Sequence, residues 1–188
     1  MVMEFKELNS KNWSSFEELF GEKGACGGCW CMTWRLRSSE YEKQKGVGNK
    51  KAFKQLVSDK SPVGILAFEG KEPVGWCSVS PRRDFTRLGN SRILKAVDNK
   101  EVWSIVCFFI KKGFRRQGLS VKLINAAVEF AQTKGARTIE AYPIEPKKNP
   151  VPEVFAFTGL ASAFFQAGFT EVARNSETRP IVRKDLTA

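Results

Sequence analysis

The sequence contains no histidine. This absence excludes Ser-His-Asp and Cys-His catalytic arrangements, and it excludes any zinc site that uses imidazole ligands. Proton transfer must therefore use Glu, Asp, Tyr, Cys, Lys or water. Acidic residues are also scarce relative to basic ones: 20 Asp and Glu stand against 31 Lys and Arg, so the net charge is +11. This excess favours anionic partners, such as nucleic acid or a phosphate-rich cofactor.

Long apolar runs are absent too, since none approaches the ~20 residues of a membrane span. The first residues, Met1–Lys6, lack the basic-then-apolar pattern of a signal peptide. These two absences predict a cytoplasmic protein with no membrane partner. The five cysteines are an odd number without a secretory context, which predicts reduced thiols. The length of 188 residues predicts one domain that spans residues 1–188.

The hydrophobic pattern predicts an α/β protein with a strand–helix–strand unit at its centre. A proline- and lysine-rich stretch, Glu145–Glu153, is expected to be a loop. Strands are expected at seven places, namely Val2–Leu8, Val63–Glu69, Val74–Ser80, Val102–Ile110, Thr138–Tyr142, Thr170–Arg174 and Pro180–Lys184. Helices are expected at four places, namely Asn12–Phe20, Lys50–Val57, Gly118–Lys134 and Gly159–Gln166.

The stretch Val102–Ala131 is the most informative part of the chain. Its apolar strand is followed by a basic, glycine-bearing turn, Lys111–Ser120, and an amphipathic helix begins directly after the turn. The first turn of a helix has free backbone N–H groups and the positive end of the helix dipole. Arginines lie beside them in the sequence. The pattern therefore predicts a binding site for a phosphate or pyrophosphate group.

Two motifs in this order of elements resemble the GNAT superfamily of N-acetyltransferases. The sequence Arg115-Arg116-Gln117-Gly118-Leu119-Ser120 resembles the family's Arg/Gln-x-x-Gly-x-Gly/Ala cofactor signature, and Ala163–Phe169 resembles its helix that ends in Gly-Phe. The order of strands and helices matches over nearly the whole chain. Three further segments, Cys29–Arg35, Val74–Cys77 and Glu140–Pro143, resemble a bacterial subgroup of predicted acetyltransferases.

The resemblance implies a mixed central sheet flanked by helices, with splayed central strands, and it implies acetyl-CoA as co-substrate without a metal. Backbone N–H groups from Arg116 to Ser120 would hold the pyrophosphate, and a backbone N–H near Phe108 would polarise the thioester carbonyl. The cofactor-binding residues expected from the resemblance are Phe108, Ile110, Arg115, Arg116, Gln117, Gly118, Leu119 and Ser120.

Two positions depart from the family's usual acid and base. Phe164, or Phe165 if the alignment slips by one residue, stands where many members carry a proton-donating Tyr, and Ser104 stands where some carry a Glu. Glu140 and Tyr142 lie one period-two step apart on one face of a strand. We therefore take Glu140 as the candidate base and Tyr142 as the candidate acid, with a structural role as the alternative.

The acceptor side of the site is expected around three tryptophans, Trp30, Trp34 and Trp76. The sequence Cys26-Gly27-Gly28-Cys29-Trp30-Cys31 has three interpretations. Structural zinc needs four ligands and this segment offers three, so a metal is not expected. The other interpretations are a loop with small apolar cysteines and a wall of the acceptor pocket. Arg82 and Arg83 would either face the acceptor or the adenosine 3′-phosphate, or form a solvated basic loop, and we favour the loop.

The sequence therefore predicts an N-acetyltransferase that acts as a monomer or homodimer. An amine of a small molecule or a protein would attack acetyl-CoA directly in a ternary complex. The alternative is a non-catalytic module that binds acyl-CoA or nucleic acid. The missing Tyr and strand Glu favour this alternative, but nucleic acid is not expected as a partner because the basic residues are scattered and no nucleic-acid motif accompanies them.

Overall fold

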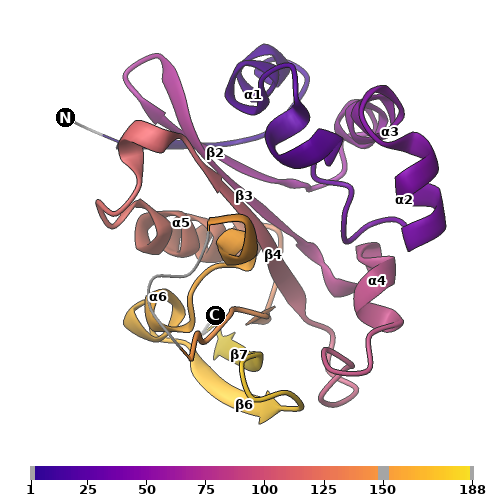
Figure 1. Cartoon of the computed structure of the whole chain (residues 1–188). Helices are drawn as coiled ribbons and strands as arrows, with labels where there is room; N and C mark the ends of the chain where they lie inside the picture. Colours follow the sequence, from indigo (N-terminus) through magenta and orange to yellow (C-terminus); the bar gives the residue numbers. More distant parts are fainter. Residues whose placement is uncertain (1–2, 148–152, 187–188) are drawn as a thin grey trace.

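A seven-stranded sheet forms the centre of the computed structural model, which describes residues 3–147 and 153–186 (Figure 1). The strand order is β1-β2-β3-β4-β5-β7-β6, and every neighbouring pair is antiparallel except β4 and β5, which are parallel. The strands are β1 (Met3–Glu7), β2 (Gly64–Glu69), β3 (Glu72–Pro81), β4 (Trp103–Ile110), β5 (Thr138–Ala141), β6 (Thr170–Arg174) and β7 (Pro180–Asp185). The predicted mixed sheet is confirmed.

Each predicted helix is also present. These are α1 (Trp13–Phe20), α3 (Val47–Ser58), α5 (Leu119–Thr133) and α6 (Ala161–Gln166). Among the described residues two α-helices were not predicted, α2 (Ser38–Gln44) and α4 (Thr86–Gly89), and a 3₁₀ helix, Glu153–Thr158, begins at the last residue of the expected loop. Val2 of the first expected strand and residues 148–152 of the expected loop lie outside the described residues.

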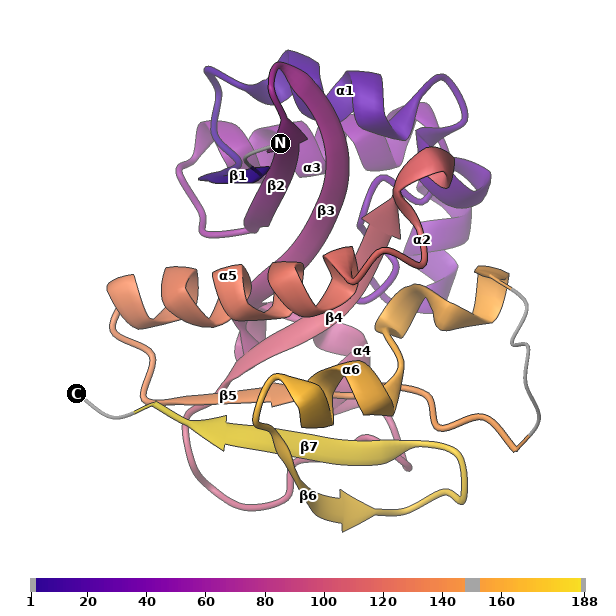
Figure 2. The same cartoon turned by 90° about the vertical axis from the view of Figure 1, so that its left-hand side faces the viewer.

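Helices cover both faces of the sheet (Figures 1 and 2). On one face, α5 and α6 pack on the sheet because the apolar stripe predicted for α5 is buried, from Leu119 and Leu123 to Ala127 and Ala131. On the opposite face, α1 and α3 enclose an aromatic core around the fully buried Trp76. In the described part of the chain, no helix has the length and apolar character to cross a membrane.

The sheet opens between its two central strands. β5 pairs with β4 only at Trp103, Ser104 and Ile105, so β4 continues from Val106 to Ile110 without β5 beside it (Figure 2). On its other edge, β4 carries a bulge at Val106, because Ser78 pairs with Cys107 whereas Val79 pairs with Ile105. The expected splay of the central strands is therefore present, and the bulge lies where the strands part.

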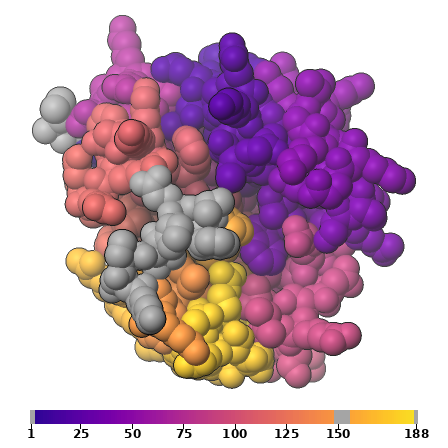
Figure 3. Space-filling model, viewed as in Figure 1, coloured from indigo at the N-terminus to yellow at the C-terminus, as the bar shows by residue number. Residues whose placement is uncertain are grey.

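The N-terminal helical layer meets the C-terminal segments on one face of the molecule. Figure 3 shows indigo and purple N-terminal residues directly beside orange and yellow C-terminal ones on this face. Segments far apart in the sequence thus enclose the region around the open half of β4.

Candidate functional site

The turn before α5 has an unusual backbone. Arg116 (φ 60°) and Gly118 (φ 75°) are both left-handed, while Arg115 between β4 and this turn is extended. Left-handed residues in a tight turn direct consecutive backbone N–H groups to one side, which forms a cradle for an anion. Since α5 begins at Leu119, the N–H groups of its first turn add to this cradle. This backbone is compatible with the predicted phosphate site, which stays a prediction.

Two side chains fix the position of this turn. The Nε of Arg115 donates a hydrogen bond to the carbonyl oxygen of Ile110, at 2.7 Å, and the Nε2 of Gln117 donates to the carbonyl oxygen of Gly113, at 2.8 Å. Leu119 has a buried side chain in the core, so only its backbone faces the turn. The bonds made by Arg115 and Gln117 tie the turn to the end of β4 and hold its left-handed residues in place.

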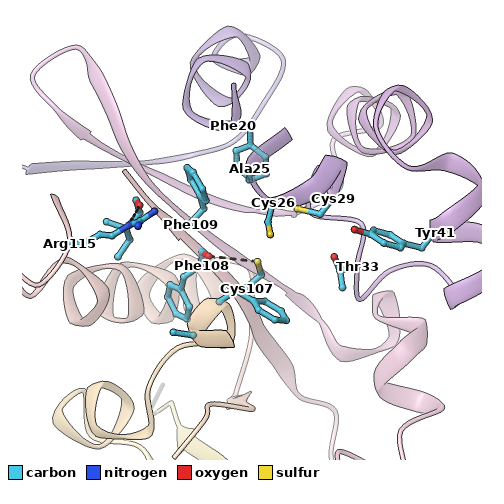
Figure 4. A pocket seen from close by; sticks show the side chains of 13 residues that line it. Phe20, Ala25, Cys26, Cys29, Thr33, Tyr41, Cys107, Phe108, Phe109 and Arg115 are labelled. Atoms are coloured by element: carbon cyan, nitrogen blue, oxygen red, sulfur yellow. Dashed lines mark hydrogen bonds between the residues drawn. The ribbon is translucent and has the colours of Figure 1, made fainter. Parts of the chain in front are cut away.

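A pocket of about 530 Å³ lies against the open half of β4 (Figure 4). Arg115 lies at one end of it and Tyr41 at the other, with β4 between them. Most of the wall is apolar or aromatic. The lining residues are Phe20, Ala25, Cys26, Cys29, Thr33, Tyr41, Cys107, Phe108, Phe109, Ile110, Arg115, Ala156 and Phe157. The pocket thus joins the expected thioester position at Phe108 to the cradle before α5.

The segment Cys26–Cys31 forms part of this pocket wall, but the three predicted tryptophans do not. Cys26 and Cys29 line the pocket. Trp30 and Trp76 are instead buried in the aromatic core under α1, and Trp34 packs beside Phe157 with its ring centroid 6.5 Å away. Large aromatic side chains contribute most when buried, and the core beneath α1 supplies that environment. Other aromatic residues, among them Phe20, Tyr41 and Phe157, line the pocket instead.

All five cysteines are free thiols. Within residues 3–147 and 153–186, no three His, Cys, Asp or Glu side chains are grouped to hold a metal ion. Burial raises the pKa of the Cys29 thiol, and weaker hydrogen bonds from backbone groups oppose that shift. Cys29 is therefore protonated at neutral pH and acts as a neutral part of the pocket wall.

Glu140 and Tyr142 lie in a buried ionic network outside the pocket. Glu140 is 0% exposed and Tyr142 is 1% exposed. Glu140 accepts hydrogen bonds from the Nε of Arg183 at 2.6 Å, from the Nη1 of Arg82 at 3.2 Å and from the Tyr142 hydroxyl at 2.6 Å. The same network includes the Ser104 hydroxyl, 2.9 Å from the Tyr142 hydroxyl. This geometry favours a structural role over the acid and base roles expected from the sequence.

Tyr142 also has the wrong proton affinity for an acid at neutral pH. Burial, followed by the negative charge of Glu140, raises the pKa of the Tyr142 phenol far above its ordinary value. Arg82 contacts the hydroxyl and donates to the carbonyl oxygens of Leu88 and Leu94, at 3.3 and 2.9 Å. Arg82 is therefore bonded into this network and does not belong to a solvated basic loop as we expected, whereas Arg83 is exposed.

The helix α6 presents no phenol to the site. Phe164 is fully buried and meets Phe108 edge to face, with ring centroids 5.9 Å apart, while Phe165 is 41% exposed at the surface. Sequence reasoning missed Gly159, which lies against this pair. A Cβ built on Gly159 would lie 2.8 Å from the Phe164 ring and 3.0 Å from the Phe108 ring. The close approach of this backbone holds Phe108 in position at the splay.

Comparison of the sequence with known protein families points to the same fold as the splayed strands, the bulge and the left-handed turn before α5. The family model of the acetyltransferase (GNAT) family matches residues 30–150, which is more than half of the 188 residues. The chain belongs to the GNAT family. No curated protein matches the chain. The match includes β4, the turn before α5 and α5 itself, and therefore the whole of the candidate cofactor site.

Solved structures show the same GNAT fold at low identity. A paiA N-acetyltransferase from Thermoplasma acidophilum, in complex with coenzyme A, matches with a TM-score of 0.55 and 14% identity over 99% of this chain and 100% of that one. A GNAT acetyltransferase from Listeria monocytogenes gives 0.59 and 11% over 98% and 95%. NAA60 from Arabidopsis thaliana, in complex with acetyl-CoA, gives 0.52 and 13% over 98% and 100%. At these identities the likeness concerns the fold.

Proposed function

We propose that this GNAT protein transfers the acetyl group of acetyl-CoA to the nitrogen of an amine, by direct attack in a ternary complex. The observation that carries the proposal is the continuous path from the left-handed turn at Arg116–Gly118, along the open half of β4, into the pocket. Related folds have been solved with coenzyme A and with acetyl-CoA, which supports the choice of co-substrate.

The cofactor would lie with its pyrophosphate on the backbone N–H groups from Arg116 to Ser120, where Arg115, Arg116 and Gln117 surround it. Its extended pantetheine arm would pair with the open backbone of Phe108 and Ile110, since these β4 residues have no β5 partner. An N–H near Phe108 would then polarise the thioester carbonyl. The bulge supports this role because it changes the direction of the backbone groups at the splay.

The acceptor would be a small amine with an apolar or aromatic body. Aromatic and aliphatic side chains dominate the pocket wall, and none of its described lining residues is a carboxylate. A pocket without negative charge gives no electrostatic preference for polycations such as polyamines. Expectations on the domain (residues 1–188), the monomer or homodimer and the cytoplasmic location stay predictions.

The second candidate is a binder of acyl-CoA without turnover, which the buried Phe164 in place of a phenol favours. One experiment separates the two. Acetyl-CoA is incubated with the protein and a panel running from aniline and benzylamine to spermidine and a lysine peptide, and CoA release and acetylated product are measured. Transfer to the apolar amines is expected. Tight acetyl-CoA binding without transfer to any amine would support the binder instead.

A further inference from the structure

Two thiols of the pocket wall lie at the ends of one tight turn. The backbone N–H of Cys29 donates to the carbonyl oxygen of Cys26 at 3.2 Å, and both residues between them, Gly27 (φ 58°, ψ 35°) and Gly28 (φ 76°), are left-handed. Two left-handed central residues are typical of a type I′ turn, which glycine adopts without strain. Such a turn holds its first and last Cα atoms within about 7 Å of each other, a separation that a disulfide can bridge.

This turn is anchored from behind. The carbonyl oxygen of Gly28 accepts hydrogen bonds from the Nδ2 of Asn49, at 3.2 Å, and from the backbone N–H of Gly46, at 3.0 Å. Asn49 belongs to α3 and is 0% exposed, so the anchor lies in the protein interior. Because an anchored turn already brings Cys26 and Cys29 together, a bond between their sulfurs needs little movement of the backbone.

The same two thiols can be reached from solution. Cys26 is exposed and Cys29 is half-buried, whereas Cys31 and Cys77 are buried, and the half-buried Cys107 lies on β4 outside the turn. Cys26 and Cys29 both line the pocket, and in Figure 4 the Cys29 sulfur is directed toward Cys26. Within the described residues they belong to no group that could hold a metal ion. The pair is therefore open to a small oxidant.

The backbone around the pair is strained. Ala25 (φ 67°, ψ −90°), Trp30 (φ 42°) and Cys31 (φ 60°) have positive φ although none is glycine, and they are three of the five such residues in the described chain. Strained residues of this kind collect at binding sites and at switches. Ala25 itself lines the pocket, so a change in this segment reaches the wall directly.

One hydrogen bond links the redox state of Cys29 to the shape of the wall. The Cys29 thiol donates to the carbonyl oxygen of Gly24 at 3.4 Å, and a cysteine in a disulfide has no proton to donate. Gly24 lies tightly against Trp30, because a Cβ built on Gly24 would collide with the indole. Trp30 stacks on Phe20, with ring centroids 5.8 Å apart, and Phe20 lines the pocket. Oxidation therefore removes one anchor of the wall.

We propose that Cys26 and Cys29 form a reversible disulfide that weakens the binding of the acceptor amine. The effect on the amine rests on the proposed acetyl transfer, whereas the disulfide itself does not. Because the bond closes a loop of only four residues, it constrains the unfolded chain little. An exposed disulfide of this kind is readily reduced again, so it acts as a switch and not as a structural cross-link.

The oxidant is a small disulfide such as oxidised glutathione. The exposed Cys26 sulfur loses its proton and attacks one sulfur of this compound, which leaves a mixed disulfide and a first small thiolate. The Cys29 sulfur then loses its proton and attacks the Cys26 sulfur, which releases the second small thiolate. The two thiolates take up the two protons. Two cysteines are thus oxidised, and the small disulfide is reduced to two thiols.

The first test follows the thiols of the full chain without any substrate. Wild type, Cys26→Ser, Cys29→Ser and the control Cys107→Ser, whose thiol lines the same pocket outside the turn, are incubated with oxidised glutathione. Remaining thiols are alkylated, and mass spectrometry of the fragmented peptide locates each bond. We expect a Cys26–Cys29 bond, reopened by dithiothreitol, in wild type and in Cys107→Ser. Cys29→Ser should keep glutathione on Cys26, and Cys26→Ser should form no bond.

Glutathione that stays on Cys26 in the wild type, or a bond that includes Cys31, would overturn the proposal. Either result would mean that the turn does not present Cys26 and Cys29 to each other.

The second test compares turnover of benzylamine and acetyl-CoA by oxidised and reduced protein. Oxidation should raise the KM for benzylamine about fivefold, as expected for the loss of one hydrogen bond that holds the wall, and dithiothreitol should reverse the change. The KM for acetyl-CoA should stay constant, because the turn before α5 is not altered. In Cys26→Ser the KM for benzylamine should be the same under both conditions.

A disulfide that forms without any change in the KM for benzylamine would overturn the control of the acceptor. A wild type that forms the disulfide but acetylates no amine would defeat the proposed function, and the control of the acceptor with it, while the dithiol pair would stand.

Discussion

At residue 118 the backbone is left-handed, and glycine adopts this conformation without strain. No atom lies within 4 Å of a Cβ built there, so Gly118→Ala has room for its methyl group and should cost only about 1 kcal/mol of folding free energy. Alanine resists the left-handed φ, so the N–H groups of the turn should no longer converge. We expect the Kd for acetyl-CoA to rise about tenfold, a loss of about 1.4 kcal/mol, in isothermal titration calorimetry.

Gly113→Ala is the control for this prediction, because Gly113 lies in the same connection, has no positive φ and also has an open Cβ position. It should keep wild-type affinity and melting temperature. Equal losses of affinity in the two variants would show that the left-handed turn is not the anion cradle.

Glu140 neutralises two arginines inside the protein, so Glu140→Gln leaves their charges partly uncompensated. Removal of one partner of a buried pair costs about 3 kcal/mol of stability or more, and urea unfolding should show that loss. The exposed pair of Glu171 and Arg174 provides the control, since Glu171→Gln should cost less than about 1 kcal/mol.

Tyr142→Phe should keep kcat within about threefold if the network is structural, and a 100-fold loss would restore Tyr142 as the acid.

Asp98 gives a prediction on pH. Hydrogen bonds from Arg183 lower the pKa of Asp98 from 3.8 to about 2. A carboxylate with a depressed pKa stabilises the fold above its unfolded pKa, and this contribution is lost as the pH falls through the folded value. The difference in unfolding free energy between wild type and Asp98→Asn should therefore be constant above about pH 5 and shrink between about pH 4 and 2. A pH-independent difference would contradict this assignment.

Single-residue roles were the hardest to predict from the sequence. The signature at Arg115–Ser120, with its single glycine, was readable from the sequence because the spacing of a turn is local. The network of Glu140 joins Arg82 and Arg183, which lie 58 and 43 positions away along the chain, and no local pattern indicates such pairs. The hydrogen bond from Trp76 to the Cys31 sulfur likewise joins residues 45 positions apart.

Among the elements, β4 and α6 are held together at Gly159. A Cβ at this left-handed residue would press on the rings of Phe108 and Phe164, so Gly159→Ala combines overpacking with backbone strain and should cost about 3 kcal/mol. Gly135→Ala is the matched control, since Gly135 has a similar φ and nothing within 4 Å, and it should cost about 1 kcal/mol. Thermal unfolding of both variants measures the difference, which would vanish if Gly159 did not support Phe108.

Strands and long helices were predictable because their apolar residues repeat locally. β4 and α5 follow this rule, with bounds within about two residues of those expected. The sequence pattern did not predict α2 because none of its residues is buried, and it did not predict α4 because that helix is a single turn. The splay of β4 depends on pairing with other strands, so the resemblance to a family indicated it where periodicity could not.

For the molecule as a whole, the net charge of +11 should speed and strengthen the binding of a polyanionic cofactor. We expect the Kd for acetyl-CoA to rise about tenfold between 20 and 500 mM NaCl, because salt screens the attraction. Dephospho-CoA, which has less charge, serves as the control and should respond less. A salt-independent Kd would assign acetyl-CoA binding to local contacts alone.

The open half of β4 leaves a gap in the sheet that an extended ligand can fill. A pantetheine arm seated there acts as a surrogate strand and gives the open β4 backbone a partner on its free edge. The two halves of the sheet, β1 to β4 and β5 to β6, would then unfold as one unit. Hydrogen exchange of the Val106–Ile110 amides should therefore slow when the ligand is bound. Ligand binding would in this way make the unfolding of the whole sheet more cooperative.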